Sequence, residues 1–191
     1  GQAEEAEAEF QSALRLRPDY ALARANLGDS LLRRGKPAEA AAEFSRALTD
    51  DPDSVEARSN DGVALLQLDR RPEAIAEFRR ALALEPGFTP AAVNLGNALL
   101  QAGNPAAAAD CLQAALARSP ASFSLHNNLA LALLQLGRRA EALDHFRRAL
   151  ALDPAQASGS AGYLWLRLGQ EDEAVARFRA EMPAPIAPAP P

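Results

Sequence analysis

Residues of the same kind recur along this chain at a constant spacing of 34 residues. The clearest column is proline, at Pro18, Pro52, Pro86, Pro120 and Pro154. Four further columns keep this register: glycine or aspartate (Gly1, Gly35, Asp69, Gly103, Gly137), alanine (Ala6, Ala40, Ala74, Ala108, Ala142), alanine again (Ala13, Ala47, Ala81, Ala115, Ala149), and phenylalanine or leucine (Phe10, Phe44, Phe78, Leu112, Phe146). A fixed period of this length is typical of repeat proteins, whose units stack because none buries its apolar face alone.

Each repeat is predicted to be a pair of antiparallel helices, with Ala21 taken as position 1 of the first complete repeat. Helix A occupies positions 1 to 14, and the turn near position 15 is usually glycine, which adopts a positive φ without steric cost. Helix B runs to about position 28, and the proline at position 32 prevents its continuation. Small residues at position 8 let the two backbones approach; they are Gly28, Gly62, Gly96 and Ala130. The aromatic residue at position 24 fills the wedge between hairpins.

The repeats divide the chain into an array and a tail. Residues 1–17 are predicted to be a helix B whose helix A is missing, so we expect a longer natural protein. The complete repeats are 21–54, 55–88, 89–122, 123–154 and 155–182, and the last one fits the pattern only after a two-residue deletion following Pro154. Residues 183–191 are rich in proline and alanine, which predicts an extended linker or a segment that packs on the array.

The columns resemble the tetratricopeptide repeat family, whose pattern is W-x2-L-G-x2-Y, A-x3-F, A and P on a 34-residue period. The resemblance covers residues 1–182, although Arg24, Arg58, Ala92 and His126 replace the tryptophan and leucines replace the tyrosine. It implies an all-α fold, a right-handed superhelical solenoid whose A helices line a concave groove. The related pentatricopeptide repeats bind RNA, but their basic grooves do not match a chain with a net charge of −5.

No catalytic constellation is present in the sequence. His126 and His145 occupy positions where other repeats carry arginine, alanine, glutamate or cysteine, so we expect both on the helix surface. Cys111 is interpreted as a small, partly buried residue. Two histidines on different helices and one cysteine do not make a zinc site, and no glycine-rich phosphate loop exists. We therefore expect no enzyme activity, no cofactor and no metal.

The composition also limits the partners and the compartment. The acidic net charge disfavours nucleic-acid binding, because phosphate backbones are repelled. No apolar run approaches the roughly 20 residues that a membrane helix needs. The arginine-rich, alanine-rich sequence suggests the cytoplasm of a bacterium, with the periplasm remaining open because the N-terminus looks truncated.

One polar column stands out at position 6: Asn26, Asn60, Asn94 and Asn128, with Ser160 in the offset last repeat. Asparagine inside a helix costs about 0.5 kcal/mol relative to alanine, so the column needs a reason. A primary amide can bind the C=O and N–H of a peptide group together. The column is similar to the asparagine ladder in the tetratricopeptide arm of O-linked N-acetylglucosamine transferases. Local packing or capping is the alternative. The predicted groove also contains Asp29, Arg33, Asn97 and Asn127.

The predicted function is a non-catalytic scaffold that binds an extended peptide of a partner protein in the concave groove. The lysines of a chaperone-type carboxylate clamp are missing, so that activity is not expected. Two alternatives stay open. The chain could be the substrate-recruiting arm of a glycosyltransferase or sulfotransferase, or it could assemble with itself through its ends, where Phe10 and Leu14 are predicted to be partly exposed.

Overall fold

The computed structural model describes residues 2–154, with side-chain burial from residue 6 onward. Within this range the chain forms nine α-helices and no strand. In order they are α1 (Gln2–Leu16), α2 (Ala21–Arg33), α3 (Pro37–Asp50), α4 (Val55–Gln67), α5 (Arg71–Leu84), α6 (Thr89–Gln101), α7 (Pro105–Leu116), α8 (Phe123–Gln135) and α9 (Arg139–Leu152). The predicted last repeat, Ser160 and the proline-rich tail lie outside the described residues.

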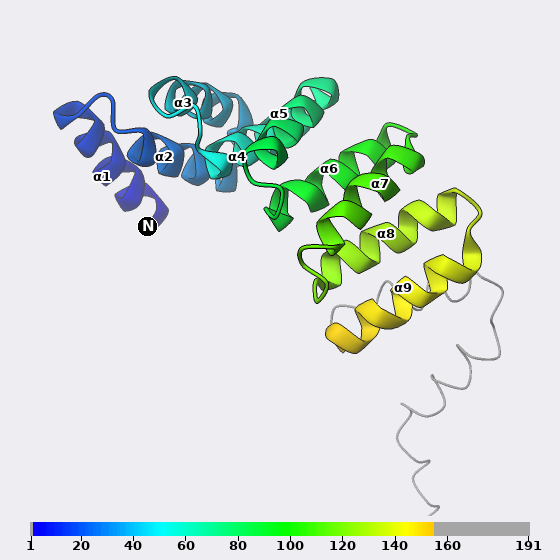
Figure 1. The fold of residues 1–191 in the computed structure, drawn as a ribbon. Coiled ribbons are helices and arrows are strands. Elements are labelled where there is room, and N and C mark those ends of the chain that lie inside the picture. Colours follow the sequence, from blue (N-terminus) through cyan, green and yellow to red (C-terminus); the bar gives the residue numbers. More distant parts are fainter. Residues whose placement is uncertain (1, 155–191) are drawn as a thin grey trace, which may run out of the picture.

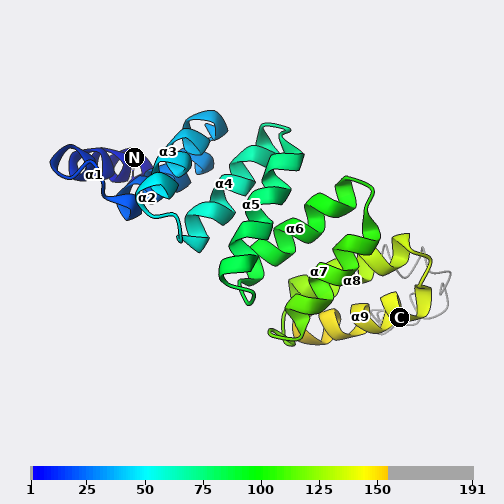
Figure 2. The same cartoon turned by 45° about the horizontal axis from the view of Figure 1, so that its top comes forward.

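The helices form an elongated stack of antiparallel pairs, which Figures 1 and 2 show from two directions. In the described part, each helix contacts its neighbours along the chain, and the A helices α2, α4, α6 and α8 also contact one another. No two B helices in this part are in contact. The A helices therefore lie on the tighter, inner side of the stack. The predicted all-α solenoid is confirmed.

The turns inside the hairpins require a left-handed backbone conformation. Gly35, Gly103 and Gly137 have φ of 72°, 73° and 75°, as the glycine column predicts. Asp69 takes the same place in the second repeat with φ of 57°, a conformation that short polar residues tolerate better than others. The small turn residue therefore sets the antiparallel return of each helix B.

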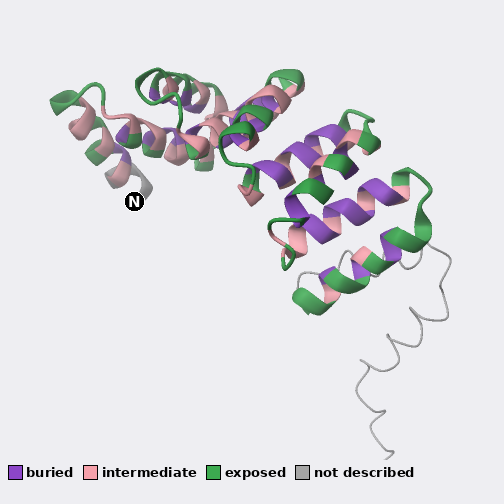
Figure 3. Ribbon diagram, viewed as in Figure 1, coloured by how far each residue is buried: buried purple, intermediate pink, exposed green. Residues whose placement is uncertain are grey.

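Each hairpin is closed by a large side chain of helix B that packs on a small residue of helix A. Phe44 and Phe78 are completely buried. A Cβ atom added to Gly62 would lie 2.6 Å from Cε1 of Phe78, and one added to Gly28 would lie 2.8 Å from Cε1 of Phe44. The position-24 ring therefore sits against its own hairpin, where glycine makes room for it. Figure 3 shows the buried residues concentrated where the helices face one another.

Candidate functional site

The position-6 asparagines lie one on each A helix but differ in exposure. Asn26 on α2 is exposed, Asn60 on α4 and Asn94 on α6 are half-buried, and Asn128 on α8 is only 7% exposed. A ladder of equivalent amides would show similar exposure in every repeat. The inner face therefore has two different halves.

The N-terminal half is open. Asn26 and Asn60 line one pocket of about 550 Å³ between α2 and α4, and neither amide has a hydrogen-bond partner among the described residues. Leu22, 61% exposed, supplies an apolar wall. The predicted residues Asp29 and Arg33 also line this pocket and form an ion pair at 2.8 Å.

Three amides of the C-terminal half, those of Asn97, Asn127 and Asn128, are bonded to one another. Nδ2 of Asn128 donates to Oδ1 of Asn97 at 2.8 Å, which links α8 to α6. Nδ2 of Asn127 donates to Oδ1 of Asn128 at 3.2 Å. Asn94 lies on the same helix as Asn97, one turn earlier, and takes no part in these hydrogen bonds. Here Asn97 and Asn128 form a polar connection between stacked A helices.

Comparison with known proteins agrees with this architecture. The family model described as tetratricopeptide repeat matches residues 1–55, 26–87, 93–157 and 135–187. The chain belongs to the tetratricopeptide repeat family. Proteins with this fold mediate protein–protein interaction, and the helix pairs described above are its repeats. No curated protein sequence matches the chain.

Several solved structures share this tetratricopeptide fold. A crystal structure of MamA is 24% identical, with a TM-score of 0.74 over 82% of this chain and 92% of that chain. YrrB, described as a tetratricopeptide protein with an unusual peptide-binding site, is 22% identical, with a TM-score of 0.69 over 88% and 84%. A thermophilic tetratricopeptide protein of Thermus thermophilus is 24% identical, with a TM-score of 0.69 over 84% and 89%.

The expectation that the two histidines lie on the helix surface is wrong for His126. This side chain occupies the position of the family's tryptophan and is only 5% exposed. Its Nε2 lies 3.0 Å from the carbonyl oxygen of Pro120, and its Nδ1 lies 2.9 Å from Nδ1 of His145, which is half-buried. Position 4 points toward the neighbouring B helices, so the varied residue types there are buried partners rather than surface residues.

A clue to this contact was present in the sequence. Positions 4 and 23 change together, as Arg24 with Glu43, Arg58 with Glu77, Ala92 with Cys111, and His126 with His145. Joint changes of this kind indicate side chains that touch. Cys111 follows the same rule, because its Sγ lies 4.0 Å from the carbonyl oxygen of Ala92. Burial raises the pKa of this thiol to about 11, which leaves it protonated and unreactive near neutral pH.

Asp61 is a half-buried acid in a column of leucines. It occupies position 7, where the other repeats carry Leu27, Leu95 and Leu129. It is half-buried on α4 without a hydrogen-bond partner among the described residues. Its pKa is raised to about 6, mainly by burial and then by the nearby carboxylate of Glu77. A charged group therefore stands in an apolar column of the array.

We expect Asp61→Leu to stabilise the protein at neutral pH. The folded-state pKa lies above the unfolded value, so the ionised carboxylate destabilises the fold above about pH 6, and protonation removes this cost as the pH falls. A pKa shift of this size, discounted for the solvent-exposed part of the side chain, corresponds to a gain of about 1–2 kcal/mol in the free energy of unfolding.

The measurement is the urea-induced unfolding of both proteins at several pH values. The difference in stability should shrink between pH 6 and 4, as Asp61 becomes protonated in the folded protein. A gain that stays constant over this range would show that shape, rather than charge, limits the stability at this position.

Two further features of the described part bear on possible ligands. It contains no group of three or more histidine, cysteine, aspartate or glutamate residues that could hold a metal ion. None of its helices is long and apolar enough to cross a membrane.

Proposed function

We propose that this tetratricopeptide chain is a non-catalytic scaffold that binds an extended segment of a partner protein on the inner face of its A helices. The observation that carries the proposal is the pocket between α2 and α4, where Asn26 and Asn60 have no partner within the described structure. An amide without a partner can donate to a backbone C=O and accept from a backbone N–H. Such contacts bind a peptide without depending on its side chains.

The charges around this pocket favour a basic partner segment. Its lining carries the carboxylates of Asp29, Asp51 and Glu56 against the single guanidinium of Arg33, which is already paired with Asp29. A lysine or arginine of the ligand would meet two unpaired carboxylates here. Leu22 offers an apolar surface for a neighbouring ligand residue. We therefore expect an extended segment that combines basic and apolar residues.

A protein of the same fold supports a peptide ligand: YrrB is described as having an unusual peptide-binding site. We propose that the asparagine column holds a peptide in the manner of the asparagine ladder of the O-linked N-acetylglucosamine transferases. Among the column's asparagines in the described residues, Asn26 and Asn60 line a common pocket, so α2 and α4 carry the proposal.

The proposal predicts that the double substitution Asn26→Ala with Asn60→Ala weakens peptide binding by about 10- to 100-fold, as expected for the loss of two to four hydrogen bonds. The melting temperature should not fall, because neither amide bonds to the described part of the fold. The ligand is the strongest-binding peptide of an array of basic and apolar sequences. Its affinity is measured by isothermal titration calorimetry.

Asn128→Ala provides the matched control. This substitution removes two hydrogen bonds and leaves Asn97 without its donor, so we expect a loss of stability of about 1–3 kcal/mol. The affinity for the same peptide should be retained. Unchanged affinity in the double variant would disprove the role of the α2–α4 amides.

A further inference from the structure

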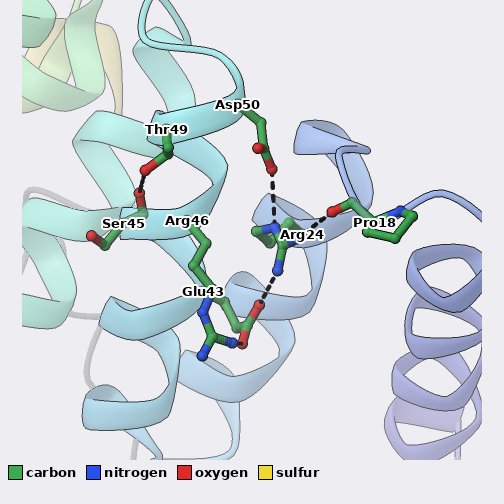
Figure 4. Close-up of polar contacts among 7 residues, drawn as sticks. All are labelled: Pro18, Arg24, Glu43, Ser45, Arg46, Thr49 and Asp50. Atoms are coloured by element: carbon green, nitrogen blue, oxygen red, sulfur yellow. Dashed lines mark hydrogen bonds and ion pairs between the residues drawn. The ribbon is translucent and has the colours of Figure 1, made fainter.

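A carboxylate held between two arginines connects the helices of the first repeat. Nη1 of Arg24 lies 3.3 Å from Oε2 of Glu43, and Nη1 of Arg46 lies 2.7 Å from Oε1 of the same glutamate (Figure 4). The Arg24 guanidinium also donates to the carbonyl oxygen of Pro18 in the preceding repeat. The glutamate therefore joins positions 4, 23 and 26 of one hairpin.

The second repeat has the same arrangement. Nη1 of Arg58 lies 2.8 Å from Oε2 of Glu77, and Nη2 of Arg58 donates to the carbonyl oxygen of Pro52 at 2.6 Å. Arg80 pairs with the other oxygen of Glu77. Arg58 and Glu77 are 15% and 12% exposed, so this carboxylate is well shielded from water. Two repeats thus use the same site for a carboxylate.

The fourth repeat keeps an arginine at position 26 but lacks the carboxylate. Positions 4, 23 and 26 are His126, His145 and Arg148. His126 still contacts the preceding proline carbonyl, as the arginines do. Arg148 has no ion-pair partner among residues 6–154, unlike Arg46 and Arg80. The third repeat is neutral at all three positions (Ala92, Cys111, Ala114) and offers no such site.

A pocket of about 540 Å³ lies at these residues, between the C-terminal ends of α7 and α9. Its walls are largely apolar and include Leu116, Pro120 and Leu152, and both histidines line it. Arg148 is the only permanently charged residue among those that line it in the described structure. Two other pockets of this part are each lined by three carboxylates and one arginine, so of these three only the histidine-lined pocket suits an anion.

We infer that this pocket binds an acidic–hydrophobic segment of a partner protein, whose carboxylate lies beside His145 and Arg148 and supplies the negative charge that Glu43 and Glu77 supply in the first two repeats. The apolar side chain next to that carboxylate packs against Leu116 and Leu152. The site is separate from the inner groove, because His126 and Asn128 are two residues apart on α8 and so point about 200° apart around the helix. The chain therefore has two recognition surfaces of opposite charge preference.

The protonation of the histidine pair couples this binding to pH. A carbonyl oxygen only accepts, so Nε2 of His126 carries a proton. In the neutral pair Nδ1 of His126 then accepts from Nδ1 of His145, which leaves Nε2 of His145 without a proton. Burial, followed by His126 and Arg148, holds the pKa of His145 below its ordinary value. A bound carboxylate opposes this lowering of the His145 pKa, because its negative charge stabilises the protonated form of the histidine pair.

The groups around His145 support this direction. Asp144 and Glu141 on its own helix act weakly in favour of the charged form, against burial, His126 and Arg148. The residues of α7 that line the pocket (Gln113, Leu116 and Ala117) carry no charge. Binding of the carboxylate should therefore strengthen as the pH falls from about 7 to about 5, because the free pair takes up its proton only below the ordinary histidine pKa of about 6.5.

The probe is an acetylated, amidated Asp-Phe-Asp peptide, compared with Asn-Phe-Asn and Asp-Ala-Asp. Titration of the full chain, followed by NMR of the imidazole and leucine methyl signals, should show Asp-Phe-Asp binding at least about tenfold more tightly than either control. The affinity should rise as the pH falls from about 7 to about 5. Equal affinity of all three peptides would overturn the inference.

Two variants connect the binding to the proposed residues. His145→Glu rebuilds the internal carboxylate beside Arg148 and should abolish Asp-Phe-Asp binding while the protein stays folded. Arg148→Gln changes an exposed side chain and should weaken binding several-fold without affecting the fold. Wild-type affinity in both variants would also overturn the inference. Retained binding of the inner-groove peptide to His145→Glu separates this site from the proposed α2–α4 site.

Discussion

Replacing Phe78 by alanine is expected to lower the free energy of unfolding by about 3–5 kcal/mol. The ring is completely buried and packs against Gly62, which has no side chain to move into the space that the ring leaves. The cavity would therefore stay largely open, and the cost would reach the upper part of the range for buried aromatic residues. Urea-induced unfolding followed by far-ultraviolet circular dichroism measures the difference.

Two substitutions serve as controls for this result. Leu84→Ala removes a side chain that is 43% exposed at the end of the same helix, and we expect a much smaller loss. Phe78→Leu copies the third repeat, where Leu112 packs on Gly96, and should cost less than the alanine variant. If Phe78→Ala were no more damaging than Leu84→Ala, the ring would not be what closes the hairpin.

The second large effect is expected for Glu77→Ala, which should cost about 2–3 kcal/mol. The substitution leaves Arg58 with its charge shielded from water, and Nε of this arginine already lacks a hydrogen-bond partner. Arg80 loses its carboxylate at the same time. Thermal unfolding at low salt provides the measurement, because part of the interaction is screened as the salt concentration rises.

Glu73→Ala is the matched control on the same helix. Glu73 pairs with Arg70, but both side chains are about half exposed, so removing the carboxylate should change the stability little. Acetate added to Glu77→Ala should restore part of the lost stability by entering the site between the two arginines. Equal losses in Glu73→Ala and Glu77→Ala would show that burial does not strengthen the arginine–glutamate contacts.

The outcome for Glu77→Ala also bears on the histidine pocket. This variant would remove the position-23 carboxylate from the second repeat, so that the second repeat lacks it as the fourth repeat naturally does. Rescue by acetate would show that the site between positions 4 and 26 accepts a carboxylate from solution. The inferred partner segment would do the same at His145 and Arg148.

The sequence by itself was sufficient to predict the helical hairpins and their stacking. The turn glycines, the prolines and the paired residues at positions 8 and 24 act on the backbone within one repeat, so their spacing predicts where each helix begins, ends and packs. These signals are local, and the 34-residue period repeats them in the same form along the chain.

Only the tertiary structure decided which polar side chains are free and which are engaged. Asn60 and Asn128 share one column, yet the first lines the pocket between α2 and α4 and the second bonds to Asn97, 31 residues away. The sequence predicts His126 on the helix surface, although it is buried beside His145. Asp61 is half-buried in a column that other repeats fill with leucine. The reason is that hydrogen bonding and burial depend on the neighbouring repeat, whose residues differ at each level of the stack.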